Sequence, residues 1–128
     1  MLVSIALLAA GCGVRNSTPF TAKASATCLR THGFREVTTD PAEVGFVAGF
    51  AANGGLRATS PTGNVLTIAF DADPSSTAST VQAFRQHAPK RLRPHLSDIL
   101  SVSRNAVLVW TITPASGEVA TVNGCLRS

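Results

Sequence analysis

The densest group of ionisable side chains lies in residues 84–95, FRQHAPKRLRPH. It includes four cations: Arg85, Lys90, Arg91 and Arg93. Near an anionic surface each such charge contributes about 1 kcal/mol of attraction, so this group could hold the protein against acidic lipid or an acidic polymer. We prefer a plainer interpretation, a solvated helix end and loop whose cations complement the partial negative charge of the last carbonyl groups. The anionic contact stays open as the alternative.

A second group consists of His95 and Asp98, which fall on one face of a helical turn, with Ser97, Ser101 and Ser103 nearby. A His–Asp pair can act as a general base and its orienting group, but a hydrolase also needs a nucleophile held against the base. The chain contains no G-x-S-x-G, H-E-x-x-H or G-x-x-x-x-G-K-[ST] motif. We therefore assign no catalytic residue, and a small hydrolase or enzyme accessory using this region is the alternative.

Metal ligands are sparse in the sequence. Asp71 and Asp73 could offer two carboxylates to a hard cation, but Asp73 precedes Pro74 as a helix N-cap and no third ligand is evident. The sequence contains no C-x-x-C pair and no local cluster of cysteine and histidine that would indicate zinc. We expect no metal and no cofactor.

An uncharged, mostly apolar run precedes Cys12. Residues 1–11 are too short to span a bilayer, which takes about 20 apolar residues in a helix, but they suit the apolar region of a secretory signal peptide. Leu8-Ala9-Ala10-Gly11-Cys12 resembles the lipobox of bacterial lipoproteins, in which small residues precede a cysteine that receives a diacylglyceryl group. The resemblance implies a signal peptide over residues 1–11, lipidation of Cys12, and a polar tether over residues 12–21.

The segment departs from the lipobox pattern in two ways. Ala9 stands where the motif usually has leucine. No positive charge occurs before Arg15, which leaves open whether translation starts upstream of Met1. The alternative is a buried N-terminal helix with a structural cysteine, in a cytoplasmic protein.

The number of cysteines fits a lipidated Cys12. The chain has three, so lipidation of Cys12 leaves Cys28 and Cys125 as a pair. Two cysteines in an oxidising compartment outside the cytoplasm are expected to form a disulfide, which here would close a loop of nearly the whole domain. Otherwise both would be small, buried, apolar residues with free thiols.

Length and charge limit the fold and the partners. A chain of 128 residues fits one domain with a single core, here residues 22–128. Its net charge of +4 suits an anionic membrane or wall polymer nearby and is too small to indicate nucleic acid. The expected partners are membrane lipid, through Cys12, and an envelope protein or polymer whose identity the sequence does not give.

Hydrophobic spacing and cap residues predict the element order α-β-α-β-β-α-β-α. The expected helices cover residues 21–32, 40–53, 73–88 and 116–127, and the expected strands cover 34–37, 56–59, 64–71 and 105–113. Ser116 would cap the last helix, for which a hairpin strand is the alternative because of its β-branched residues. Residues 89–104 are a basic connection with a candidate strand at 99–102.

Five phenylalanines fall on apolar faces and are expected in the core: Phe34, Phe46, Phe50, Phe70 and Phe84. Trp110 is expected there too, with a partner surface as its alternative.

The expected fold is an α+β domain, a small antiparallel sheet built mostly of hairpins and packed with helices. The helix carrying Cys28 and the segment carrying Cys125 would lie side by side. This arrangement is similar to small uncharacterised lipoproteins of actinobacteria, through the lipobox, CLRTHGF at 28–34, RNAVLVW at 104–110 and the final CL at 125–126. Because these motifs are structural, the resemblance implies a location and no activity. We expect a non-catalytic binding or structural module of the cell envelope, anchored on the outer face of the cell membrane.

Overall fold

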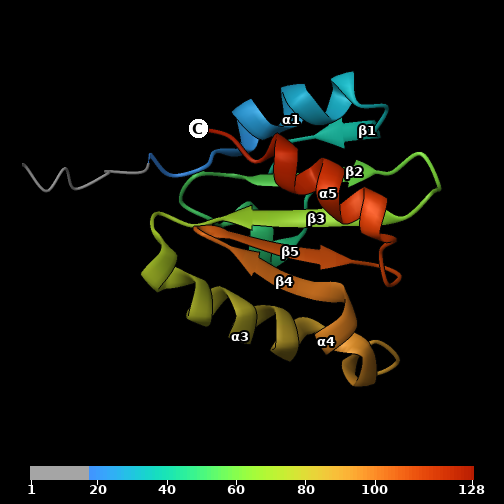
Figure 1. Ribbon diagram of the computed structural model, residues 1–128. Helices are drawn as coiled ribbons and strands as arrows, with labels where there is room; N and C mark the ends of the chain where they lie inside the picture. Colours follow the sequence, from blue (N-terminus) through green and yellow to red (C-terminus); the bar gives the residue numbers. More distant parts are fainter. Residues whose placement is uncertain (1–17) are drawn as a thin grey trace, which may run out of the picture.

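The computed structural model describes residues 18–128 and shows an α+β domain (Figure 1). One antiparallel sheet has the strand order β1-β2-β3-β5-β4. The strands are β1 (Arg35–Thr38), β2 (Gly55–Thr59), β3 (Val65–Phe70), β4 (Leu100–Ser103) and β5 (Ala106–Trp110). The helices are α1 (Ala22–Thr31), α2 (Phe46–Gly49), α3 (Thr77–His87), α4 (Leu96–Ile99) and α5 (Ser116–Cys125), with 3-10 turns η1 (Pro74–Ser76) and η2 (Arg93–His95). The expected fold class is confirmed. β4 corresponds to the candidate strand at residues 99–102, and α4 is an additional element.

Helices cover both faces of the sheet because side chains alternate along its central strands. On one face, Ile68 and Phe70 of β3 join Leu29 of α1 and Val122 of α5 in the main core. On the other face, Ala69 of β3 packs in a smaller cluster that lies under α2 and α3. The strand is therefore buried on both sides, as its continuous apolar sequence indicates. No helix among the described residues has the length and apolar character needed to cross a membrane.

The second helix is much shorter than expected. Instead of covering residues 40–53, α2 is a single turn that starts after Gly45, whose φ of 93° interrupts the helix. The side chain of Asp40 accepts a hydrogen bond from the backbone N–H of Ala42 at 2.9 Å, so it closes a local turn in place of a helix N-cap. A Cβ on Gly55 would lie 2.5 Å from the carbonyl oxygen of Ala48. The glycine thus lets α2 lie directly on β2.

The C-terminal segment is a helix, so its apolar spacing predicts the structure better than its β-branched content does. Val122 and Cys125 face the core from α5. The expected cap at Ser116 is wrong, because the helix starts after Ala115, whose backbone N–H donates to a carboxylate oxygen of Glu118 at 3.1 Å. A carboxylate in the first turn of a helix also complements its partial positive charge.

The described part of the expected tether, residues 18–21, is bonded to the domain. Asn105, which precedes β5 and is almost completely buried, accepts from the backbone N–H of Phe20 at 2.8 Å. Its amide group donates to the carbonyl oxygens of Phe20 and Asp71. Arg104 lies over the ring of Phe20, 4.1 Å from its centroid. Residues 18–21 therefore belong to the folded unit and not to the tether over residues 12–21.

Candidate functional site: a disulfide and an apolar hollow

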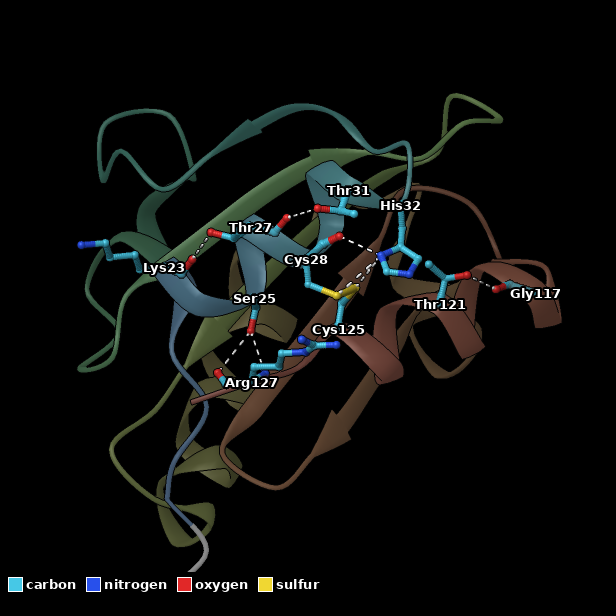
Figure 2. Close-up of a disulfide and its surroundings, with 10 residues drawn as sticks. All are labelled: Lys23, Ser25, Thr27, Cys28, Thr31, His32, Gly117, Thr121, Cys125 and Arg127. Carbon is cyan, nitrogen blue, oxygen red and sulfur yellow. Dashed lines mark hydrogen bonds between the residues drawn. A yellow bond between two sulfur atoms is a disulfide. The ribbon is translucent and has the colours of Figure 1, made fainter.

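A disulfide joins Cys28 of α1 to Cys125 at the end of α5 (Figure 2). The two residues are 97 positions apart in the sequence, and their Cα atoms are 5.3 Å apart. Both side chains are buried in the main core. Beside them, the backbone N–H of Arg127 donates to the hydroxyl of Ser25 at 3.1 Å, which ties the C-terminus to α1. The expected pairing is confirmed.

His32, one turn after Cys28, lies against the disulfide. Its Nδ1 is 3.6 Å from each Sγ atom and 2.9 Å from the carbonyl oxygen of Cys28. Because a carbonyl oxygen only accepts, this contact places the hydrogen on Nδ1. His32 is not among the predicted site residues, although its i, i+4 spacing from Cys28 indicates that the two side chains are neighbours. Cys28, His32 and Cys125 are metal-binding residue types with their ligand atoms within 4.8 Å of one another, but sulfurs bonded to each other offer no thiolate to a metal.

Cys12 and the lipobox lie outside the described residues. The signal peptide over residues 1–11, the lipidation of Cys12 and the tether over residues 12–17 therefore stay predictions.

The four cations of the basic segment are exposed, but they occupy different places. Arg85 lies on α3. Lys90 and Arg91 lie in the connection that follows α3, and Arg93 begins η2. The Nε of Arg93 donates to the carbonyl oxygen of Ala88 at 3.2 Å, so its side chain folds back over the connection. The segment is thus a helix end followed by an exposed connection, which agrees with the plainer interpretation.

An apolar hollow of about 530 Å³ lies between α2, the end of α3, and α4. Thr67 of β3 and Val109 of β5 lie in the sheet beneath it. Its apolar lining includes Val44, Val47, Phe84, Leu92, Leu96 and Ile99. Binding sites for small molecules usually have volumes of about 300–1,000 Å³ and mostly apolar linings. In size and lining the hollow therefore suits a small apolar ligand.

Two phenylalanines of the α2 region lie exposed beside the hollow. The expectation that Phe46 and Phe50 belong to the core is wrong, because 68% and 81% of their surfaces are exposed. A single helical turn buries one face, and in α2 that face is Ala48. The two rings meet edge to face with centroids 5.2 Å apart, and His87 of α3 lies 5.1 Å from the ring of Phe46. Clustered exposed aromatic rings of this kind mark binding surfaces more often than isolated ones do. Trp110, by contrast, is buried in the core as expected.

A second hollow of about 540 Å³ lies on the other side of Phe46 and Val47, which line both. Asp71 lies in its lining and is 6% exposed. One carboxylate oxygen accepts from the hydroxyl of Thr80 at 2.8 Å, and the other has no hydrogen-bond partner among the described residues. Burial raises the pKa of Asp71 above its usual value, and the bond from Thr80 opposes that shift.

Asp71 and Asp73, the two carboxylates considered as ligands for a cation, have different structural roles. Asp73 caps η1 by accepting from the backbone N–H of Ser76 at 3.2 Å. The hydroxyl of Ser75 also donates to Asp73, and this bond is the main cause of a pKa below the usual value for that carboxyl. Asp71 instead lies buried against Thr80. The two carboxylates therefore serve different neighbours.

The residues of the alternative enzyme interpretation lie on the surface. His95 ends η2 and Asp98 belongs to the single turn of α4, and both side chains are exposed. Neither lines either of the two hollows. No family model, curated protein or solved structure matches the chain.

Proposed function

We propose that the chain is a lipoprotein, anchored through Cys12 on the outer face of the cell membrane, whose domain is a non-catalytic module that binds a small apolar ligand. The observation that carries the binding role is the apolar hollow between α2, α3 and α4, with Phe46 exposed at its edge. A diacylglyceryl group supplies two acyl chains, and stable anchoring takes two such signals where one chain binds only reversibly.

The cysteines support the proposed location. With Cys28 bonded to Cys125, Cys12 is the third cysteine of the chain, and the lipobox resemblance gives it a role. Disulfides persist in oxidising compartments and are rare in the cytoplasm. A disulfide-bonded domain is thus what a lipoprotein on the outer face would carry.

The lining of the hollow favours binding over catalysis. Among the described residues, Thr67 and His87 are the polar side chains that line it, and no carboxylate does. A hydrolytic triad needs a nucleophile, a base and an acid that orients the base. The runner-up, a small envelope hydrolase or accessory using His95 and Asp98, would place its chemistry on exposed side chains that do not line the hollow.

A fluorescent apolar probe tests the binding role. The full chain with Cys12→Ser, which cannot be lipidated, is titrated with N-phenyl-1-naphthylamine, whose emission rises in an apolar site. We expect saturable binding that Leu92→Glu abolishes, because the change puts a charge into the lining of the hollow. The matched control is Val102→Glu, which puts the same charge on an exposed apolar residue of β4. Absence of saturable binding, or an equal loss in both folded variants, would contradict the proposal.

A further inference from the structure

We propose that the hollow holds the acyl chain of a single-chain anionic lipid, whose head group pairs with Lys90, Arg91 and Arg93. This inference rests on the proposed binding role of the hollow and names the ligand class.

The shape of the apolar surface fits an elongated ligand. The two hollows, of about 530 and 540 Å³, share Phe46 and Val47 in their linings, so together they extend along α3 beneath α2. Leu96 and Ile99 of α4 line one end of this surface, and Asp71, Ala72 and Ser76, which lie before α3, line the other. Removing apolar surface from water favours binding, and a flexible chain can follow such a path.

Cations lie at one end of this surface. The connection after α3 turns Ala88, Pro89 and Leu92 into the lining of the hollow, while Lys90 and Arg91 between them are exposed. The Nε bond from Arg93 to the carbonyl oxygen of Ala88 holds this guanidinium on the same connection. Its terminal nitrogens are the groups that pair with carboxylates and phosphates in forked geometry. The same short segment thus provides both apolar wall and positive charge.

The opposite end disfavours a negative head group. Asp71 lies in the lining of the second hollow, and one of its oxygens has no hydrogen-bond partner among the described residues. An ionised carboxylate there would repel an anionic head. The ligand is therefore oriented with its head toward Lys90, Arg91 and Arg93 and its chain toward Phe46. A domain tethered at a membrane would meet lipids of this kind at high local concentration.

The test compares three probes with the same twelve-carbon chain and different head charges. Dodecyl phosphate, dodecyl maltoside and dodecyltrimethylammonium, each below its critical micelle concentration, displace N-phenyl-1-naphthylamine from the Cys12→Ser chain. We expect the phosphate to bind most tightly and the cation most weakly, with at least about a tenfold difference between them, which corresponds to about 1.4 kcal/mol.

Charge-neutralising variants then locate the head group. The triple variant Lys90→Gln, Arg91→Gln, Arg93→Gln should bring dodecyl phosphate to the affinity of dodecyl maltoside and leave the maltoside unchanged. The control has the same loss of charge at exposed arginines outside the hollow, by Arg35→Gln, Arg57→Gln and Arg127→Gln, and should keep the preference for phosphate. Equal affinity for all three probes, or tighter binding of the cation, would overturn this inference and leave the hollow as a binding site. If no probe bound, both this inference and the proposed binding role of the hollow would be contradicted.

Discussion

The disulfide should contribute a large part of the free energy of unfolding. A crosslink lowers the entropy of the unfolded chain more as the closed loop becomes longer, and a loop of about 100 residues gives about 4.7 kcal/mol at 25 °C as an upper value. Cys28 and Cys125 are 97 positions apart, so nearly the whole described chain lies in the loop. Domains of this size are stable by about 5–15 kcal/mol in total. Cys28→Ala with Cys125→Ala should therefore remove about a third or more of the stability.

The folded structure should survive this double substitution. Three hydrogen bonds hold the C-terminus at α1 without the sulfurs. Arg127 N–H donates to the Ser25 hydroxyl, and the Arg127 carbonyl oxygen accepts from the Ser25 hydroxyl and from Thr21 N–H. Most of the decrease in the free energy of unfolding then comes from the unfolded chain, whose conformational entropy rises without the crosslink.

Urea unfolding measures the effect, with the fluorescence of the buried Trp110 as the signal and Cys12→Ser in both proteins. The variant should have a lower midpoint and a larger m-value, because its unfolded chain exposes more surface. A loss below about 1 kcal/mol with an unchanged m-value would refute the loop-entropy reasoning.

Three further substitutions test individual features of the fold. Burial raises the pKa of Asp71 in the folded state, so the free energy of unfolding falls as the pH rises from the pKa of the unfolded chain toward that of the folded one. Asp71→Asn should be more stable than the unsubstituted protein at pH 7, and thermal melts across pH 3–8 should show that this pH dependence is lost. Gly55→Ala would bring its Cβ within 2.5 Å of the carbonyl oxygen of Ala48 and should cost about 1–3 kcal/mol in urea unfolding. Asn105→Ala removes the side-chain bonds to Phe20 and should speed proteolysis of the N-terminal segment; unchanged cleavage would contradict its anchoring role.

Local signals predicted the elements well where each residue's preference agreed with its packing. Thr21 caps α1 by accepting from the backbone N–H of Ala24, and Gly33 follows the helix with a φ of 85°, as the sequence indicates. Residues 60–63 join the two expected strands 56–59 and 64–71 through a turn, closed by a bond from Gly63 N–H to the Ser60 carbonyl oxygen. These features depend on neighbours within a few positions, which the sequence shows directly.

The errors arose where the outcome depends on distant residues. In the α2 region, the spacing of Phe46 and Phe50 fits a buried helical face. The helix is instead a single turn after Gly45 that packs Ala48 against Gly55 of β2, and both rings are exposed. Nothing in the sequence places the connection after α3 at the edge of a hollow formed by α2.

The disulfide and the position of His32 beside it could both be predicted from the sequence. The pairing of Cys28 with Cys125 followed from counting cysteines once Cys12 was given a separate role. The position of His32 could have been predicted in the same way, because its i, i+4 spacing places it beside Cys28 and the expected pairing brings Cys125 to the same place.

The most direct test of the proposed role is the intact mass of the protein taken from its native membrane. Free thiols are alkylated before denaturation and, with a second reagent, after it. The proposal predicts a chain that begins at Cys12, carries the mass of a diacylglyceryl group and has no labelled thiol. An unprocessed chain with three labelled cysteines would contradict both the anchor and the disulfide, and the domain would then be a cytoplasmic protein with free thiols at Cys12, Cys28 and Cys125.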